Sequence, residues 1–505
     1  MIARRRGARV PARILAGFAG VLVGLGVTAA PSGAAVTVDG AGSTWSSIAV
    51  SQWAADVARQ GLSINYQANG STAGRVFYYS SQVDFAVSEV PFQDAYRDSS
   101  GTTTTNEIQL ASKRPYAYLP IVAGGTSFMY NLVINGTRLN NLNLSPETLA
   151  RIFTGGITKW NDPAIAADNP GVPLPALTVR PVIRSDGSGT TAQFTAFMAS
   201  QTPTVWQAFC QRVGLGAGCR PTSLYPEFPG STAQQFSDGV AAYVAAPYNN
   251  GSITYVEYGY AKQRSFPVAS VLNAAGYYAQ PTPQAVAIAL QGARLNPDRT
   301  QVLDGVYRNP DARAYPVSSY SYMIVPTSTA SPFTAEKGEV LGRFIAYFLC
   351  AGQQKAAQLG YSPLPRVLVE AAFDAQRLIP GAPAPPPIDQ CANPTITGDF
   401  ITGAAPAPPA SARKGAVRPS GVAGAGPGAA TGGTGATGVD GPTGVDGEAT
   451  RILDGQLLAR AEPIAVRAPS EEPAWAFALL GLGLALVVFG PPGLAHLLRR
   501  RGGQR

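Results

Sequence analysis

Short apolar strands that alternate with amphipathic helical segments between residues 36 and 392 constrain the fold of this chain most. Apolar side chains alternate over Leu62–Tyr66 and again over Phe85–Val87, which predicts half-buried strands. Residues 46–59 and 340–348 instead carry apolar stripes at helical spacing, which predict two helices packed on a core. Strands that alternate with helices predict an α/β architecture.

Three clusters of Gly, Ser and Thr lie where a predicted strand leads into a predicted helix. They span Gly40–Trp45, Asn69–Gly74 and Arg184–Thr191, the last before a helical segment at residues 192–200. Helix N-termini carry unpaired N–H groups and partial positive charge, and small residues let an anion approach them. One such cluster is usually only a turn and a cap. Three of them in one α/β domain, one led by an arginine, predict a shared oxyanion site.

The histidine content excludes most hydrolase and metalloenzyme mechanisms. The only histidine is His496, nine residues from the C-terminus, so one chain cannot build a Ser-His-Asp triad, a Cys-His pair or a multi-His metal site. A hydrolase of phosphate esters with Ser188 or Thr190 as nucleophile would have only Asp186 or Glu89 as its base. We therefore predict a binding protein with no catalytic residues, no metal and no cofactor.

Both termini have the composition of targeting segments. Arginines, an apolar run and small residues follow one another over residues 1–35, which predicts a secretory signal peptide. Residues 474–498 are largely apolar and precede four arginines in 499–505, which predicts a transmembrane helix and a cytoplasmic tail. Gly490–Gly493 interrupts this span, and a cleaved tail signal is the alternative. Nine of the 38 basic residues lie in the two terminal segments, so the exported body, with 29 basic and 30 acidic residues, is nearly neutral and does not indicate a nucleic-acid partner.

Four cysteines in the exported part predict two disulfides formed in an oxidising compartment. Sequence closeness favours Cys210–Cys219 and Cys350–Cys391 among the three possible connectivities. Residues 396–473 are rich in Gly, Ala, Pro and Thr, which predicts a flexible stalk. Glycine recurs at every third position from Gly432 to Gly447, but six triplets are too few for a collagen triple helix.

A colinear series of motifs between Gly40 and Arg366 resembles the periplasmic phosphate-binding proteins of bacterial phosphate ABC transporters. The matching segments are Gly40–Trp45, Asn65–Ser71, Asp84–Pro91, Ile152–Ile165, Arg184–Thr190, Ile253–Gln263, Tyr315–Val317 and Leu359–Pro365. The resemblance implies a type II periplasmic-binding-protein fold with two lobes, each a mixed sheet flanked by helices. Residues 36–125 would form the first part of lobe 1, 126–265 lobe 2, and 266–395 the second part of lobe 1.

The resemblance also implies a function. The protein would capture inorganic phosphate outside the cytoplasm and deliver it to the permease of an ABC transporter, tethered to the cytoplasmic membrane by its C-terminal helix. The alternative is a surface adhesin or phosphate sensor that uses the same fold without transport. The stalk fits this alternative as well as it fits the receptor.

The family pattern assigns the ligand to a defined set of residues. The phosphate-binding residues would be Thr44, Trp45, Ser71, Glu89, Arg184, Ser188, Gly189 and Thr190, with Asp186 orienting the Arg184 guanidinium. The family usually has Asp at position 89, which accepts a hydrogen bond from the phosphate's own proton and disfavours fully ionised sulfate. The longer Glu89 either does this from a displaced backbone or points elsewhere. Residues 225–239 also depart from the Gly-rich family pattern, which leaves one wall of the cleft undetermined.

Overall fold

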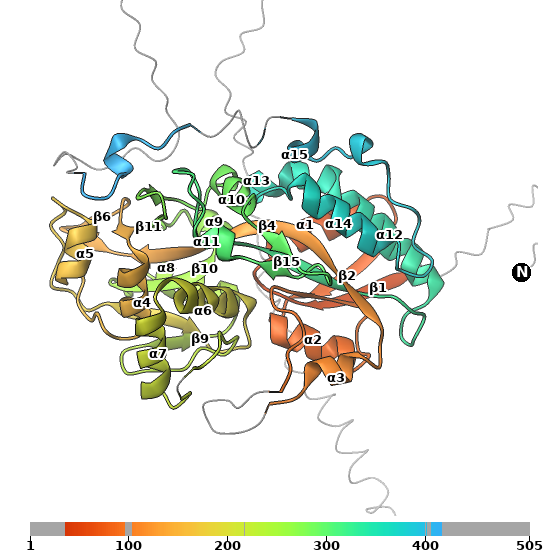
Figure 1. Cartoon of the computed structure of the whole chain (residues 1–505), viewed down its shortest axis with the longest axis horizontal. Helices are drawn as coiled ribbons and strands as arrows, with labels where there is room; N and C mark the ends of the chain where they lie inside the picture. Colours follow the sequence, from red (N-terminus) through yellow and green to blue (C-terminus); the bar gives the residue numbers. More distant parts are fainter. Residues whose placement is uncertain (1–35, 96–103, 217, 399, 401–405, 417–505) are drawn as a thin grey trace, which may run out of the picture. The chain divides into compact units, whose positions relative to one another are not determined.

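A mixed β-sheet organises the part of the chain that the computed structural model describes, residues 36–95, 104–216, 218–398, 400 and 406–416 (Figure 1). Within these residues, eight strands pair in the order β2-β1-β3-β15-β4-β10-β8-β9. They are β1 (Thr37–Gly42), β2 (Ser63–Gln67), β3 (Phe85–Ser88), β4 (Tyr116–Asn131), β8 (Arg180–Arg184), β9 (Thr232–Gln234), β10 (Ser252–Glu257) and β15 (Ser318–Pro326). Smaller sheets are formed by β12 (Tyr278–Ala279), β11 (Ser270–Leu272) and β7 (Asn143–Leu144), by β13 (Arg294–Leu295) with β14 (Gln301–Val302), and by β5 (Val133–Ile134) with β6 (Thr137–Arg138).

The long strand β4 joins two halves of the main sheet. Its residues 116–125 pair antiparallel with β15, and residues 126–131 pair antiparallel with β10. We call β2-β1-β3-β15 the first half and β10-β8-β9 the second half. The sequence predicts a separate mixed sheet in each lobe, whereas the strands belong to one continuous sheet because β4, at 16 residues, is long enough to pair with both halves.

Helices pack against both halves. The first half is contacted by α1 (Ser47–Ala58), α2 (Ser71–Tyr79), α12 (Ala335–Leu349) and, through β4, α14 (Arg366–Gln376); the second half is contacted by α6 (Gly189–Gln201), α8 (Phe236–Ala245) and α9 (Tyr258–Gln263). The shorter or more peripheral helices are α3 (Glu107–Ala111), α4 (Pro146–Phe153), α5 (Pro163–Asp168), α7 (Pro203–Arg212), α10 (Pro283–Leu290), α11 (Asp304–Tyr307), α13 (Ala356–Leu359) and α15 (Pro394–Thr397), with 3-10 turns at Ala351–Lys355, Ile388–Gln390 and Ala410–Ala412. In Figure 1, α2 and α3 lie on one side of the first half and α1 and α12 on the other.

The elements predicted from periodicity are present. The alternating segments form β2 and β3, and the two apolar stripes form α1 and α12. The stripes face each other, because Trp53 of α1 stacks on Phe348 of α12 with ring centroids 5.2 Å apart. The third glycine-rich cluster leads into α6 as predicted, although the helix begins at Gly189, three residues earlier than the apolar pattern indicates.

Both disulfides favoured by sequence closeness are formed, Cys210–Cys219 and Cys350–Cys391. Part of the range predicted to be a stalk, residues 406–416, is folded. Arg413 pairs with Tyr277 in a β-bridge, and the Lys414 N–H donates to the Gly276 carbonyl at 2.9 Å, so residues 406–416 pack on the folded unit. These contacts use backbone groups, which is why a composition low in large apolar residues does not reveal them.

The predicted targeting segments lie outside the described residues. This holds for the signal peptide (1–35), residues 417–473 of the stalk, the predicted span (474–498) and the basic tail (499–505). Across the parts of the chain that are described, we find no helix with the length and apolar character needed to cross a membrane.

Candidate anion-binding site

The three Gly/Ser/Thr clusters of the sequence meet at the carboxyl ends of β1, β2 and β8. The Gly70 N–H of the second cluster donates to the Gly42 carbonyl of the first at 2.8 Å. The Thr72 N–H, just after Gly70, donates to the Gly187 carbonyl of the third cluster at 3.2 Å. The strands β1 and β2 run in the opposite direction to β8, so the carboxyl ends of the two halves approach each other from opposite sides near the middle of β4. α/β proteins place their ligands at the carboxyl ends of strands. The predicted convergence of the clusters is therefore confirmed.

Gly42 makes this convergence possible. Its φ of +138° is one that residues with a side chain rarely adopt, and a Cβ at this position would lie 2.1 Å from the Val87 carbonyl oxygen of β3. The following Ser43 N–H donates to the same carbonyl at 2.8 Å. The first cluster is thus held directly against the end of β3, where Glu89 follows.

The carboxylate of Glu89 points into this site, which answers one question that the sequence leaves open. Glu89 is 1% exposed. Among the described residues, three serine hydroxyls donate to its carboxylate: Ser43 Oγ to Oε1 at 2.6 Å, Ser71 Oγ to Oε2 at 2.7 Å, and Ser321 Oγ to Oε1. Hydrogen bonds to a charged acceptor are among the stronger ones in proteins. The serines therefore hold the Glu89 carboxylate beside the helix N-termini.

The N-terminus of α6 contributes Ser188, Gly189 and Thr190. Ser188 caps the helix, since its Oγ accepts from the Thr191 N–H at 3.2 Å, and the Gly189 N–H donates to Ser71 Oγ at 3.1 Å. A Cβ on Gly189 would lie 1.8 Å from Glu89 Oε2, so only glycine lets an anionic group lie against this N-terminus. Thr190 is fully buried, and its Oγ1 has no hydrogen-bond partner among the described residues. Such an orphaned hydroxyl indicates a missing polar partner.

Arg184 supplies the positive charge of the site and is held by Asp186. Its Nε donates to Asp186 Oδ1 at 2.7 Å, and its Nη2 bonds the other carboxylate oxygen, so the pair is bidentate. Asp186 also accepts from the Phe236 N–H at 2.8 Å, which fixes the carboxylate itself. Arg184 is 2% exposed, and its remaining Nη1 donates to Ser237 Oγ at 3.2 Å. The guanidinium is thus oriented as the sequence predicts.

Thr44 and Trp45 come from the first cluster and complete the predicted set. Thr44 Oγ1 is 2.8 Å from Ser237 Oγ, so Ser237 links Thr44 to the guanidinium. The Trp45 N–H donates to Ser43 Oγ at 3.0 Å, and its ring packs edge-on against Tyr361 with centroids 5.7 Å apart. The structure therefore brings the predicted site residues together, with the Thr190 hydroxyl buried among them but not hydrogen-bonded within the described residues.

Two buried tyrosines support the site as neutral groups. Tyr255 OH accepts from the Arg184 N–H at 3.2 Å, and Tyr260 OH donates to the Thr44 carbonyl at 2.6 Å. Burial raises the pKa of Tyr255 and of Tyr260 to about 12 in each case, so neither adds negative charge at neutral pH. In the residues that the structure covers, no cluster of three or more His, Cys, Asp or Glu side chains is arranged to hold a metal ion.

Sequence reasoning missed Ser43, Ser237 and Ser321. Ser43 lies inside the first cluster, so closer attention to that motif would have found it. Ser237 belongs to residues 225–239, the stretch that departs from the family pattern. Ser321 lies in the buried strand β15, 232 residues from Glu89, and no local motif marks it.

Comparison with known proteins agrees with this geometry. The family described as "PBP superfamily domain" matches residues 28–351. The phosphate-binding protein PstS of Xylella fastidiosa (strain Temecula1) is 34% identical over 337 residues, which cover 66% of this chain and 83% of that protein. PstS of Pasteurella multocida is 31% identical over 341 residues, which cover 66% of this chain and 88% of that protein.

Solved structures show the same fold. A high-affinity periplasmic phosphate-binding protein, PfluDING, bound with phosphate, superposes with a TM-score of 0.51 at 19% identity and covers 67% of this chain and 93% of its own. The ancestral soluble variant of the human phosphate binding protein has a TM-score of 0.51 at 18% identity, covering 69% and 99%. With a family match over more than half of the chain and relatives above 30% identity, this chain belongs to the periplasmic-binding-protein superfamily and, within it, to the PstS-like phosphate-binding proteins.

Proposed function

We propose that the protein binds inorganic phosphate at the convergence of α1, α2 and α6 and delivers it to the permease of a phosphate ABC transporter. The observation that carries this proposal is the buried network around Arg184 and Thr190. It combines a guanidinium fixed by Asp186, helix N-termini from three clusters and an orphaned threonine hydroxyl. The PstS relatives are named for phosphate binding, and the similar solved structure PfluDING is described as a periplasmic phosphate-binding protein. Proteins of this family bind solutes and are not enzymes.

Each site residue has a proposed role. Phosphate oxygens would accept from the Arg184 guanidinium and from the hydroxyls of Thr44, Ser188 and Thr190. The Ser71 hydroxyl and the N–H groups of Trp45 and Gly189 donate to Glu89, Ser43 and Ser71 in this structure, so they would exchange those partners for the ion. Ser188 Oγ already accepts from the helix, but a hydroxyl that accepts keeps its own proton to donate. Each charge-assisted bond contributes about 1.5–3 kcal/mol before desolvation is subtracted. Closure of the two halves of the sheet, as two lobes, would assemble these donors around the ion.

Glu89 would determine the choice between phosphate and sulfate. Its carboxylate is the acceptor at the centre of the site, and a protonated phosphate oxygen can donate to it. Sulfate is fully ionised at neutral pH, so its oxygens would be repelled by the same carboxylate. The serine ligands of Glu89 support this role because they fix the carboxylate where the phosphate proton would meet it.

Calorimetry of the purified protein with phosphate, sulfate and arsenate tests the proposal. We expect tight binding of phosphate and arsenate and at least about a hundredfold weaker binding of sulfate, which corresponds to one unsatisfied charged contact. In Glu89→Gln this preference should fall because the amide carries no charge. Glu147→Gln, on the exposed surface of α4, is the control and should keep it. Failure of the wild type to bind phosphate, or equal affinity for sulfate, would contradict the proposal.

The membrane tether is a separate part of the proposal and rests on the sequence. Residues 474–498 would anchor the protein, and residues 417–473 would act as a coil with a reach of about 40 Å. Cells that express the full chain should retain the protein in the membrane fraction until detergent is added. A chain that ends at residue 473 should be recovered in the soluble fraction. If the two chains fractionate alike, the tether is wrong.

A further inference from the structure

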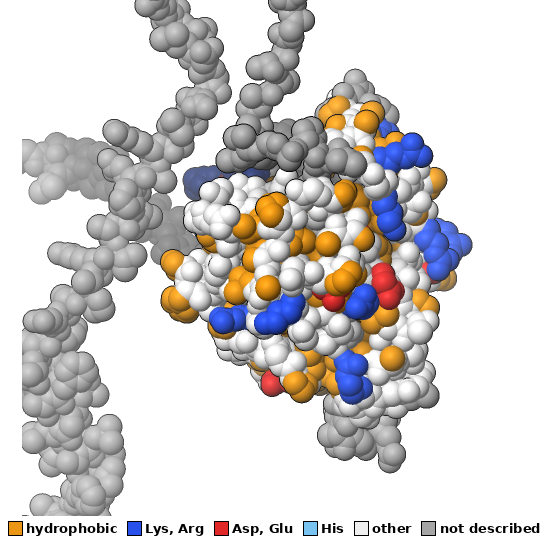
Figure 2. All heavy atoms as spheres, turned by 90° about the vertical axis from the view of Figure 1, so that its left-hand side faces the viewer, with side chains coloured by type: hydrophobic (Ala, Val, Ile, Leu, Met, Phe, Trp, Pro, Cys, Tyr) orange, Lys and Arg blue, Asp and Glu red, His pale blue; other side chains and the backbone are white. Residues whose placement is uncertain are grey.

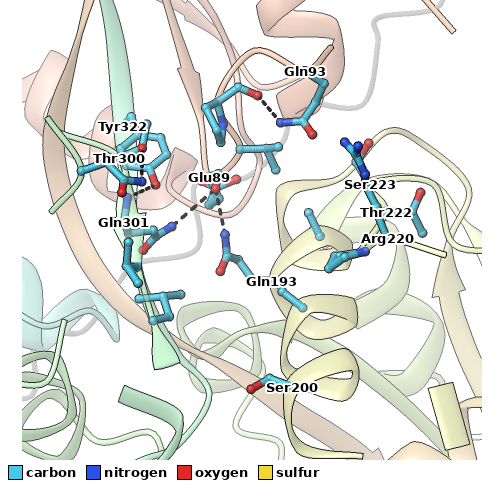
Figure 3. A pocket seen from close by; sticks show the side chains of 18 of the residues that line it. Glu89, Gln93, Gln193, Ser200, Arg220, Thr222, Ser223, Thr300, Gln301 and Tyr322 are labelled. Carbon is cyan, nitrogen blue, oxygen red and sulfur yellow. Dashed lines mark hydrogen bonds between the residues drawn. The ribbon is translucent and has the colours of Figure 1, made fainter. Parts of the chain in front are cut away.

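A cavity of about 510 Å³ with a mixed polar and apolar lining adjoins the candidate anion site on the side of the Glu89 main chain (Figure 3). It is lined by Glu89 and Gln93 of the first half, by Gln193 and Arg220 of the second half, and by Thr300 and Gln301 of the loop and strand before β15. Glu89 therefore takes part in both spaces. Its carboxylate is held by the serines of the anion site, and its main chain forms part of the cavity wall.

Two glutamine amides bind the main-chain carbonyl of Glu89. Gln193 Nε2 donates to the Glu89 oxygen at 2.8 Å, and Gln301 Nε2 donates to the same oxygen at 3.4 Å. Figure 3 shows the two side chains reaching Glu89 from different elements. A carbonyl oxygen has two lone pairs, so both amides bond it without competition.

Gln301 is itself fixed by β15, and Gln193 is carried by α6. Gln301 Nε2 also donates to the Tyr320 carbonyl at 3.2 Å, and its Oε1 accepts from the Tyr320 N–H at 3.1 Å, so β15 orients its amide. Gln193 lies one helical turn after Gly189, whose N–H donates to Ser71 in the anion site. The Gln193 bond thus ties the first turn of α6, in the second half, to Glu89 at the end of β3, in the first half.

These contacts determine where the carboxylate of a glutamate at position 89 lies. Glu is one methylene longer than the Asp usual in the family, so its backbone must lie in a defined place for the carboxylate to lie correctly. The serines fix one end of Glu89 and the glutamines fix the other. Without the amides, the main chain at residue 89 would be less firmly held, and a shift of the main chain would move the carboxylate with it.

We propose that Gln193 and Gln301 are positioning residues that fix the Glu89 carboxylate by holding its main-chain carbonyl, and that they thereby determine the preference for phosphate over sulfate. This inference rests on the proposed phosphate-binding function. It adds two residues to the specificity machinery that no local sequence motif marks. It also assigns Gln193 to the contacts between the two halves that form around the bound ion.

The test measures the ratio of phosphate to sulfate affinity in matched variants of the full chain. Gln193→Met and Gln301→Met remove the amide at similar size, and Gln193→Glu removes it and adds charge. We expect each of the three variants to lower the ratio by about tenfold, which corresponds to the loss of one hydrogen bond to the Glu89 carbonyl. Gln301→Met also loses the two bonds to Tyr320, so its thermal unfolding is compared with that of Gln193→Met. Gln193→Lys restores a donor and should keep the ratio, even if its charge strengthens the binding of both anions.

Gln93→Glu is the control for added charge. Gln93 lines the same cavity, but its Nε2 donates to the Pro91 carbonyl at 2.7 Å and does not contact Glu89. This variant should change the two affinities together and leave their ratio unchanged. Thermal unfolding of each variant separates loss of folding from loss of preference. An unchanged ratio in both methionine variants would overturn the inference, whereas a wild type that binds no phosphate would instead overturn the proposed function.

Discussion

At the scale of single residues, each charged group of the site has hydrogen-bond partners next to it. Arg184 faces Asp186, and Glu89 is surrounded by hydroxyl groups. A bound anion would therefore meet one fixed cation and many neutral donors. In such a site, geometry rather than excess charge selects the ligand, because each neutral donor forms a hydrogen bond only with a ligand oxygen at the right place.

Arg184→Ala should abolish phosphate binding and also destabilise the empty protein. Removal of the guanidinium leaves Asp186, whose side chain is 10% exposed, without its cation, and a broken buried ion pair typically costs about 3–5 kcal/mol. Calorimetry and thermal unfolding measure the two effects. Arg180→Ala, at the exposed start of the same strand, should change neither. If Arg184→Ala binds phosphate with normal affinity, the guanidinium does not belong to the binding site.

At the scale of elements, the junction between β10 and α9 contains a buried carboxyl group. The strand β10 leads into α9 through Glu257, whose Oε2 accepts from the Gly259 N–H at 2.7 Å and so caps the helix. Glu257 is fully buried, and burial raises the pKa of its carboxyl well above its usual range; the Gly259 N–H opposes this shift only in part. The folded protein therefore holds this proton to a higher pH than the unfolded chain does.

This difference predicts the pH dependence of stability. The unfolded carboxyl loses its proton near its ordinary pKa of about 4.3, so the folded state binds more protons above that pH. The contribution of Glu257 to stability is fully present below about pH 4.3 and is lost as the pH rises through the folded pKa. Glu257→Gln should match the wild type in melting temperature at acidic pH and exceed it at pH 8.

Thermal unfolding followed by circular dichroism across this pH range provides the measurement. Glu339→Gln, at an exposed position of α12, is the control and should change the melting temperature by the same small amount at every pH. If the melting temperatures of wild type and Glu257→Gln change in parallel with pH, the pKa of the buried carboxyl does not differ between the folded and unfolded states in this range, and the prediction is wrong.

At the scale of the whole molecule, the charge distribution matches a receptor that relies on local contacts. On the face seen in Figure 2, the Lys and Arg side chains are scattered among hydrophobic and uncharged polar ones. This view agrees with the nearly neutral balance of residues 36–498 in the sequence, since the excess of positive charge lies in the two terminal segments. Capture of an anion must then depend on the buried donors rather than on a broad positive field.

The sequence by itself determined much of this protein. Hydrophobic periodicity identified α1, α12, β2 and β3, because the spacing of apolar side chains follows the backbone geometry of each element. Local motifs at strand ends identified the three clusters, and spacing favoured the correct disulfides. The candidate site residues that lie within a local motif, such as Arg184 and Asp186, were found for the same reason.

Only the tertiary structure decided what depends on contacts between distant segments. It showed that Glu89 points into the site, that Ser237 and Ser321 complete the network, and that Gln193 and Gln301 hold the Glu89 carbonyl. It also joined the predicted sheets through β4 and placed residues 406–416 on the folded unit. Each of these contacts joins segments far apart in the chain, and a local sequence pattern reports the conformation of its own segment but not the partner that folding brings to it.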